Sequence, residues 1–221
     1  YAVEFLEADY IIIANPDIHV TSRCIERVKQ ALDNTEGAVM ASARVTDPQG
    51  KDLFSYWTLL PLWKDLLDTG LITRRLFKDM LNTPPYRLPN AGDEGSRLVD
   101  AVPGSFFMLK PGLLTPQDIE GLFDSRIFLY YEEKVLGRKF QEMGLKTVLV
   151  TDESYVHAHS ATIDKSLKRM VDKQRLLHQS KLYYYREYLH AGPALMAAAG
   201  VALDIILAEV WFLTVVCRMR W

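Results

Sequence analysis

Blocks of apolar and polar positions along the first fifty residues predict a strand, a helix and a second strand. Residues 10–14 form an apolar, β-branched run that is too short for a helix and typical of a strand buried on both faces, as in a parallel sheet. The Asn-Pro-Asp turn at 15–17 ends it, because proline donates no ladder hydrogen bond. Thr21 or the serine after it caps a helix that runs to about Leu32, and residues 37–43 predict a second buried strand. This succession is typical of a βα unit.

The pattern up to residue 159 predicts more strands and helices around one irregular stretch. Residues 54–95 are rich in tryptophan and proline, and we expect one helix within them, near 62–81. Strand character returns over 99–109 around a break at Gly104. The elements expected after this are a helix over 132–143 that Gly144 closes, and extended segments at 146–150 and 155–159.

The composition changes after residue 165, which predicts a domain over 1–165 and a basic, aromatic linker with a hydrophobic helical tail over 166–221. Residues 194–217 are mostly apolar and long enough to span a hydrocarbon core of roughly 30 Å. Asp204 and Glu209 interrupt this run, and a charge inside a bilayer is costly. The tail can therefore span a membrane, lie at its interface or pack on the domain. We expect membrane association.

Composition and charge exclude several classes of protein. A chain of 221 residues with 49% hydrophobic and 24% charged residues can bury a core, which excludes a disordered or collagen-like chain. A formal net charge of −2 supplies no basic field, so we expect no nucleic-acid partner. Cys24 and Cys217 form neither a disulfide framework nor a zinc motif. Because the chain begins with Tyr1, in what reads as the end of a helix, we expect a fragment that lacks its N-terminal segment.

Two groups of candidate residues follow or interrupt predicted strands. Asn15 and Asp17 come after a buried strand, where a carboxylate can hold a divalent cation beside a phosphate. The alternative is a plain turn. Gly104 and Ser105 break another strand, which lets the backbone approach a ligand or simply forms a β-bulge.

Two further groups contain titratable side chains. Glu132 and Glu133 begin a predicted helix, where the helix dipole favours acids, and one of them can also serve as a general base. His157 and His159 follow a strand and lie on the same face by alternation. A neutral imidazole there can bind a metal or a phosphate, or can be a structural histidine.

The order and spacing of these groups resemble the family 2 glycosyltransferases with the GT-A fold, most closely the rhamnosyltransferase-type branch. That family shows strand-Asn-Pro-Asp, Gly-Ala/Ser before an apolar strand, Gly-Phe-Asp-Glu-x-Phe-Phe-x-Tyr-x-Glu-Asp, and His-x-x-Gly-x-Ser. Residues 121–133 here read Gly-Leu-Phe-Asp-Ser-Arg-Ile-Phe-Leu-Tyr-Tyr-Glu-Glu. The resemblance covers about residues 1–165. It implies an α/β fold with a GT-A-type, Rossmann-like mixed sheet flanked by helices, without its N-terminal nucleotide-binding strand.

On the donor side, the resemblance implies roles for six candidate residues, two of which, His157 and His159, are alternatives. Asp17 would be the metal-binding carboxylate of a DXD-like motif, with Asn15 at the position where many relatives have the first aspartate. His157 or His159 would match the histidine that binds the metal or the diphosphate, and the spacing His-x-x-Ser-x-Thr favours His157. Gly104 and the serine after it would line the donor-sugar pocket.

On the acceptor side, Glu133 falls on the aspartate of the family's Glu-Asp pair, the usual catalytic base. Because the residue here is the longer glutamate, Glu132 is the alternative base. Asp124 would shape the acceptor loop. Trp57 is a candidate for stacking on a sugar ring, with packing in the core as the alternative.

The activity that the resemblance implies is inverting transfer of a sugar from a nucleoside diphosphate to a hydroxyl of a saccharide, expected to be lipid-linked, with Mg²⁺ or Mn²⁺ as cofactor. Such an enzyme would build cell-surface polysaccharide at the cytoplasmic face of the cell membrane. The rival hypothesis is a non-catalytic glycosyltransferase-like scaffold that docks on membranes or partners. A dinucleotide-binding dehydrogenase is excluded, because no Gly-x-Gly-x-x-Gly follows a strand.

Overall fold

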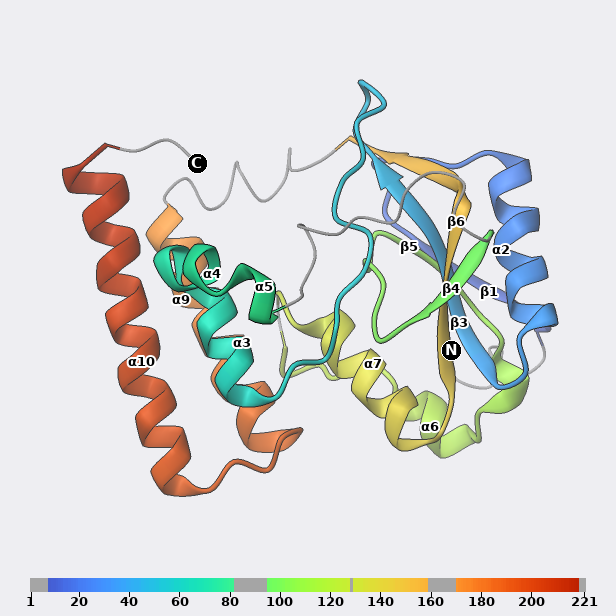
Figure 1. Ribbon diagram of the computed structural model, residues 1–221. Coiled ribbons are helices and arrows are strands. Elements are labelled where there is room, and N and C mark those ends of the chain that lie inside the picture. The colour runs from blue at the N-terminus through green and yellow to red at the C-terminus, as the bar shows by residue number, and fades with distance from the viewer. Residues whose placement is uncertain (1–7, 82–94, 128, 159–169, 219–221) are drawn as a thin grey trace. The chain divides into compact units, whose positions relative to one another are not determined.

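The computed structural model describes residues 8–81, 95–127, 129–158 and 170–218, and the chain divides into two compact units (Figure 1). The first, called the sheet unit below, comprises Tyr1–Leu59, Arg87–Asp124 and Glu132–His159. The second, called the helical unit, comprises Leu60–Tyr86, Ser125–Tyr131 and Ser160–Trp221. The predicted boundary after residue 165 lies outside the described residues.

The sheet unit contains a mixed sheet of six strands. In chain order they are β1 (Ile11–Ala14), β2 (Ile18–His19), β3 (Ala38–Thr46), β4 (Ser96–Val99), β5 (Phe106–Leu109) and β6 (Lys146–His157). The order across the sheet is β1-β5-β3-β6-β2, and β4 also pairs with β6. β3 and β6 run parallel, and the other pairs are antiparallel. The expected α/β class with a mixed sheet is confirmed.

Helices cover both faces of this sheet. They are α2 (Ser22–Asn34), the short 3₁₀ helix η1 (Pro111–Leu113), α6 (Pro116–Glu120) and α7 (Glu132–Glu142). Val28 of α2 shares one core cluster with Ala41 of β3, whereas Phe140 of α7 shares a second cluster with Leu149 of β6. Figure 1 shows α2 on one side of the sheet and α6 and α7 on the other. Because strand side chains alternate between faces, one apolar sheet supplies both clusters.

The local signals in the sequence match the ends of several elements. The Thr21 hydroxyl oxygen accepts the Cys24 N–H at 3.1 Å, which caps α2. Gly144, with φ of +72°, closes the chain after α7 in the left-handed conformation that suits glycine. β3 extends three residues beyond the predicted 37–43. The predicted helix caps and the second strand are confirmed.

The prediction that the first strand is buried on both faces is wrong. Along β1, Ile11 and Ile13 are partly buried and pack against the second core cluster, whereas Ile12 is 44% exposed. Among the described residues β1 pairs with β5 alone, in an antiparallel register. A short apolar run is equally compatible with an edge strand that buries one face, and only the strand order decides between them.

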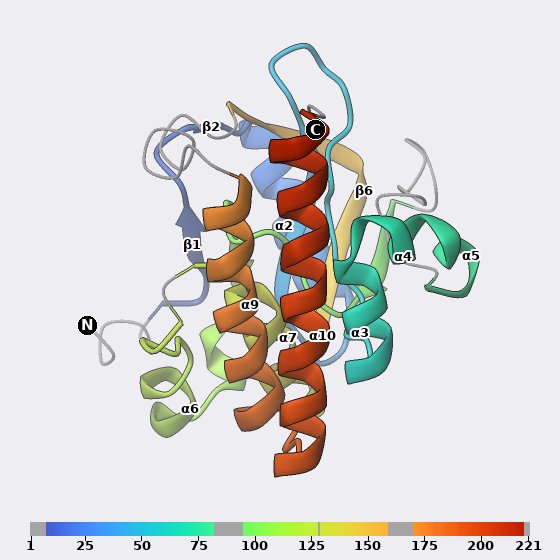
Figure 2. The ribbon, with the colours of Figure 1, turned by 90° about the vertical axis from the view of Figure 1, so that its left-hand side faces the viewer.

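The helical unit consists of α3 (Leu62–Thr69), α4 (Leu71–Leu76), α5 (Lys78–Leu81), α9 (Met170–Glu187) and α10 (Pro193–Trp211), which continues as a π-helical turn (Phe212–Val216). α10 packs against α9, α3 and α4, and Figure 2 looks onto α10 between α9 and α3. Leu203, Ile206 and Val210 form the apolar contact of α10 with these neighbours.

The single helix predicted near 62–81 is three short helices. Gly70, with φ of −71° and ψ of 140°, leaves the helical region between α3 and α4. Phe77, with φ of −107° and ψ of 19°, ends α4. Glycine disfavours a helix interior because its backbone loses the most conformational entropy, so the interruption follows from a residue inside the predicted range.

α10 and its π-helical turn cover Pro193–Val216, which is 24 residues with a mean hydropathy of 2.0. Only 22% of the most apolar window is buried. Within the described part of the chain this is the one helix long and apolar enough to cross a membrane, by length and composition. By itself this is weak evidence for association with a membrane.

Candidate functional site

The Asn-Pro-Asp turn brings Asp17 against His157. After β1 the Asn15 N–H donates to the Ser105 carbonyl at 2.8 Å, and the chain then pairs as β2 with the end of β6. The Asp17 carbonyl accepts the Ala158 N–H at 3.1 Å. This register leaves 3.4 Å between Asp17 Oδ1 and His157 Nε2. The side chain of His157 is largely buried, and the carboxylate of Asp17 is more than one-third exposed. The carboxylate oxygens of Asp17 are therefore accessible from solvent beside a largely buried imidazole.

The strand break brings Gly104 to the predicted base. The Gly104 N–H lies 3.4 Å from Glu133 Oε1, in a long hydrogen bond. A Cβ at position 104 would lie 3.6 Å from the same oxygen, which is ordinary van der Waals contact. The backbone at the break therefore contacts the carboxylate directly, and the role of Gly104 in approaching a ligand stays a prediction.

Ser105 is buried, and its hydroxyl is already used inside the sheet unit. It lies 2.6 Å from the Tyr155 hydroxyl. Tyr155 packs edge-on against Phe106 with ring centroids 5.1 Å apart. The side chain of Ser105 thus contributes a fixed internal contact, and its role in lining a donor-sugar pocket stays a prediction.

Glu132 and Glu133 occupy the first turn of α7 and differ in exposure. Glu132 is exposed, whereas Glu133 is partly buried beside Gly104. Burial, and to a lesser extent the negative charge of Glu132, raises the pKa of Glu133 to about 7. A carboxylate with this pKa is half protonated near neutral pH, which suits a group that must accept and release a proton.

The two residues before these carboxylates have an unusual backbone. Tyr130 and Tyr131 have φ of 66° and 72°, the left-handed region that costs a non-glycine residue about 1 kcal/mol or more. The Tyr131 hydroxyl donates to Asp65, which also accepts from Lys181 Nζ and the Tyr185 hydroxyl, each at 2.6 Å. This buried cluster within the helical unit fixes the ring of Tyr131, the second of the two residues with positive φ.

Sequence reasoning missed Tyr155. It lies two residues before His157 on β6, so strand alternation places both side chains on one face of the sheet. Burial raises the pKa of its hydroxyl, and the charges of Cys24 and Glu133 act in the same direction. Tyr155 therefore stays a neutral hydrogen-bonding group at all ordinary pH values. The strand alternation that predicts His157 and His159 on one face could also have identified Tyr155 from the sequence.

The remaining predicted site residues lie elsewhere or outside the description. Trp57 is partly buried, forms a backbone bridge with Ala101 and packs edge-on against Phe54 at 4.8 Å. Asp124 lies partly buried in the loop before α7. His159 lies outside the described residues. The acceptor roles predicted for Trp57 and Asp124 stay predictions.

The donor set at Asp17 and His157 fits a divalent cation that shares its ligands with a substrate. Within the described residues no group of three or more His, Cys, Asp or Glu side chains is placed to hold a metal ion by itself. Mg²⁺ is usually held by one or two carboxylates together with substrate phosphates. Mn²⁺ favours the same oxygen ligands, and imidazole is a further ligand for transition metals. Asp17 is one such carboxylate, and the His157 imidazole lies 3.4 Å from it.

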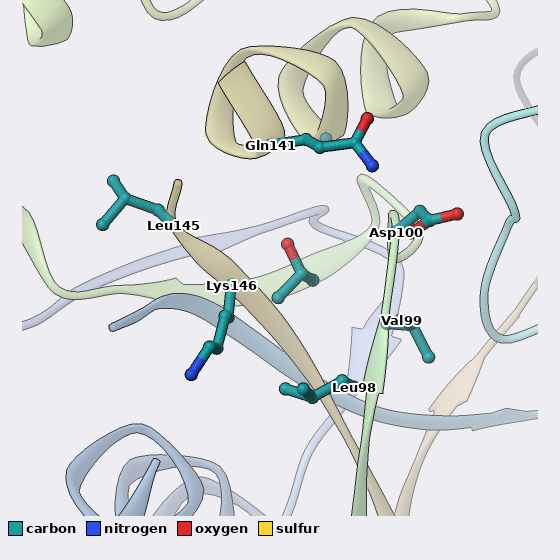
Figure 3. A pocket seen from close by; sticks show the side chains of 8 residues that line it. Leu98, Val99, Asp100, Gln141, Leu145 and Lys146 are labelled. Carbon is teal, nitrogen blue, oxygen red and sulfur yellow. The ribbon is translucent and has the colours of Figure 1, made fainter. Parts of the chain in front are cut away.

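A separate pocket of about 180 Å³ lies where the ends of β4 and β6 meet α7. Its lining includes Leu98, Asp100, Gln141 and Lys146, and Figure 3 shows Gln141 reaching from α7 over the strands. None of the predicted site residues lines it. Small-molecule sites usually enclose roughly 300–1,000 Å³, so this hollow is too small for a nucleotide sugar.

Comparison with known proteins assigns no family. A scan against protein-family models finds no match for this chain, and a search of curated proteins finds no significant match.

Proposed function

We propose that this protein is an inverting, metal-dependent glycosyltransferase of the GT-A type that moves a sugar from a nucleoside diphosphate to a saccharide hydroxyl. The observation that carries the proposal is the proximity of Asp17 to His157 and of Gly104 to Glu133. The hydrogen bond from Asn15 to Ser105 connects the two pairs. Each pair joins residues that are far apart in the chain, and these are residues to which the resemblance assigns donor and base roles.

Each side chain has a defined task in this reaction. Glu133 accepts the proton of the attacking hydroxyl, and its raised pKa keeps it a competent base near neutral pH. Asp17 and His157 hold the diphosphate side of the donor. A bound Mg²⁺ or Mn²⁺ would neutralise the negative charge that the leaving diphosphate develops. Gly104 presents its N–H to Glu133 and orients one carboxylate oxygen.

The acceptor is proposed to be lipid-linked, with the enzyme at the cytoplasmic face of the cell membrane. The apolar α10 supports attachment to a membrane, because only 22% of its most apolar window is buried within the protein. A membrane-bound enzyme meets a lipid-linked saccharide in two dimensions. Cell-surface polysaccharide synthesis is the process that fits this combination of donor and acceptor.

Calorimetric titration of the full-length protein with nucleoside diphosphates and their sugars, with and without Mn²⁺, tests the proposal. We expect binding that requires Mn²⁺ and is lost in Asp17→Ala. The matched control is Glu36→Ala, which removes an exposed carboxylate of the same unit and should bind normally. A folded protein that binds no nucleotide under any condition would favour the non-catalytic scaffold.

A further inference from the structure

The short helices α4 and α5 expose several large apolar side chains. Leu76 is 72% exposed, and Ile72, Phe77 and Met80 are each more than 40% exposed. Exposing one such residue is ordinary, but four within nine positions mark an interaction surface. Trp63 of α3 adds a fifth exposed apolar side chain from the same unit.

Basic residues accompany these apolar side chains. Residues 71–81 contain Arg74, Arg75 and Lys78 against a single acid, Asp79, although the chain as a whole has a net charge of −2. Arg74 is paired with Asp68 at 3.1 Å, and Lys78 lies beside the exposed apolar side chains. On α3, Lys64 Nζ lies 5.4 Å from the centre of the Trp63 ring. Apolar and aromatic side chains mixed with lysine and arginine are typical of helices that lie in a membrane interface.

A specific contact connects α4 to the apolar helix α10. Glu209 Oε1 accepts the Ile72 N–H at 2.7 Å, so this carboxylate caps the start of α4. Leu71 packs against the α10 residues Leu203 and Ile206 in the same core. The charge that made a spanning helix costly in the sequence thus has a partner inside the protein, and it holds α4 against α10.

α10 itself presents an uncovered apolar face. Val201 and Ile205 are more than 60% exposed, and Trp211 and Phe212 are about half exposed. The opposite face of the helix packs on its neighbours through Leu203, Ile206 and Val210. The Glu209 contact therefore places the start of α4 beside a helix whose outer face is apolar.

We propose that α4 and α5 form a second membrane contact, which lies in the headgroup region of an anionic bilayer beside α10. The apolar side chains enter the boundary between headgroups and acyl chains, while Lys78 faces anionic lipid phosphates. The bilayer is the occupant that matches both the basic charge and the contact with α10. This inference rests on the membrane association proposed for α10, but not on sugar transfer.

Fluorescence quenching on the full chain tests it. Cys217 is changed to serine, and a single cysteine at Leu76 carries an environment-sensitive dye. The native Cys24 does not compete for the dye, because it is buried and burial raises the pKa of its thiol to about 12. The protein is reconstituted in vesicles of phosphatidylcholine with phosphatidylglycerol, with and without nitroxide-labelled lipid headgroups. Two matched probes serve as references. A dye at Ile205→Cys reports the environment of α10, and a dye at the exposed turn residue Gln49→Cys reports a solvent-exposed position.

We expect quenching and a blue shift at position 76, and neither at position 49. Adding Lys78→Gln should weaken the contact of position 76 with anionic vesicles by about fivefold, with little change in pure phosphatidylcholine. Quenching at position 205 without quenching at 76 overturns the inference and leaves α10 as the membrane contact. A blue shift at 76 without quenching also overturns it, since protein then covers the surface. Nucleotide binding, measured separately, reports the proposed function whatever these probes show.

Discussion

Two buried or partly buried carboxylates, Asp65 in the helical unit and Glu133 in the sheet unit, differ in how completely they are satisfied. Asp65 is almost fully buried, and its Oδ2 atom accepts hydrogen bonds from Lys181, Tyr185 and Tyr131. The hydrogen bond from the Gly104 N–H to Glu133 is long, at 3.4 Å. Asp65 holds three segments of the chain together through short hydrogen bonds, whereas the side-chain contact of Glu133 with Gly104 is weak.

The difference shows how a structural carboxylate can be separated from a chemical one. A buried carboxylate that accepts several strong hydrogen bonds cannot take up a proton without weakening those hydrogen bonds. Beside Asp65, burial and its negative charge raise the pKa values of Tyr131 and Tyr185, so both stay protonated donors. Glu133 has a pKa near 7 and can change its state close to neutral pH. Its environment therefore suits proton transfer, and that of Asp65 suits stability.

The largest expected effect is on turnover. Glu133→Gln should lower kcat by about 10²–10⁴-fold, because the amide cannot accept the proton of the attacking hydroxyl. Its unfolding midpoint should stay close to that of the parent, since the hydrogen bond from the Gly104 N–H to Glu133 is long. Steady-state transfer assays and urea unfolding measure the two quantities. Glu36→Gln is the control, and unchanged turnover in Glu133→Gln would remove Glu133 from the base role.

Asp65→Asn should give the opposite result. Removing one partner of a buried ion pair costs about 3–5 kcal/mol of unfolding free energy, because Lys181 is left buried without its counter-charge. Far-UV circular dichroism during urea unfolding in mild detergent measures the loss. Asp172→Asn removes an exposed carboxylate that lies 4.0 Å from Arg175 and should cost less than about 1 kcal/mol. Equal losses in the two variants would contradict the structural role of Asp65.

A third test concerns the glycine that sets the position of α7. A Cβ at Gly137 would lie 2.2 Å from the Asp100 carbonyl oxygen, so Gly137→Ala forces the helix away from the sheet. We expect a loss of about 1–3 kcal/mol and lower turnover, because Glu133 moves with α7. Gly200→Ala in α10 meets nothing within 4 Å and should instead stabilise its helix by about 0.5–1 kcal/mol. Similar unfolding curves for the two variants would contradict the close contact at Gly137.

The smallest effect is a shift in pH dependence. Turnover should rise as the pH rises through about 7, because Glu133 acts in its deprotonated form. The charge of Glu132 raises the pKa of Glu133, so Glu132→Gln should move the midpoint of this rise to lower pH, by about one unit or less. Profiles of kcat against pH for both proteins measure it. A midpoint that is unchanged or moves to higher pH would show that the charge of Glu132 does not raise the pKa of Glu133.

The sequence by itself determined the elements whose signals are local. The threonine that caps α2, the glycine that follows α7 and the buried pattern of β3 are read within a few residues, because caps and strand alternation act over one or two turns. The α/β class follows from their order. Several candidate residues, such as Asp17, Glu133 and His157, could also be named from the sequence, since each is a polar group beside a predicted strand or helix, and their roles stay predictions.

Only the tertiary structure decided which of these groups meet. The position of β1 at the sheet edge depends on the strand order. The contact of Ser105 with Tyr155 and the hydrogen bond of Tyr185 to Asp65 join residues that are 50 and 120 positions apart. The same holds for Glu209, which looked like an unpaired charge in an apolar run and instead caps α4. Burial and polar contacts of this kind depend on the packing of distant segments, and a periodic pattern along one segment carries no information about its distant partner.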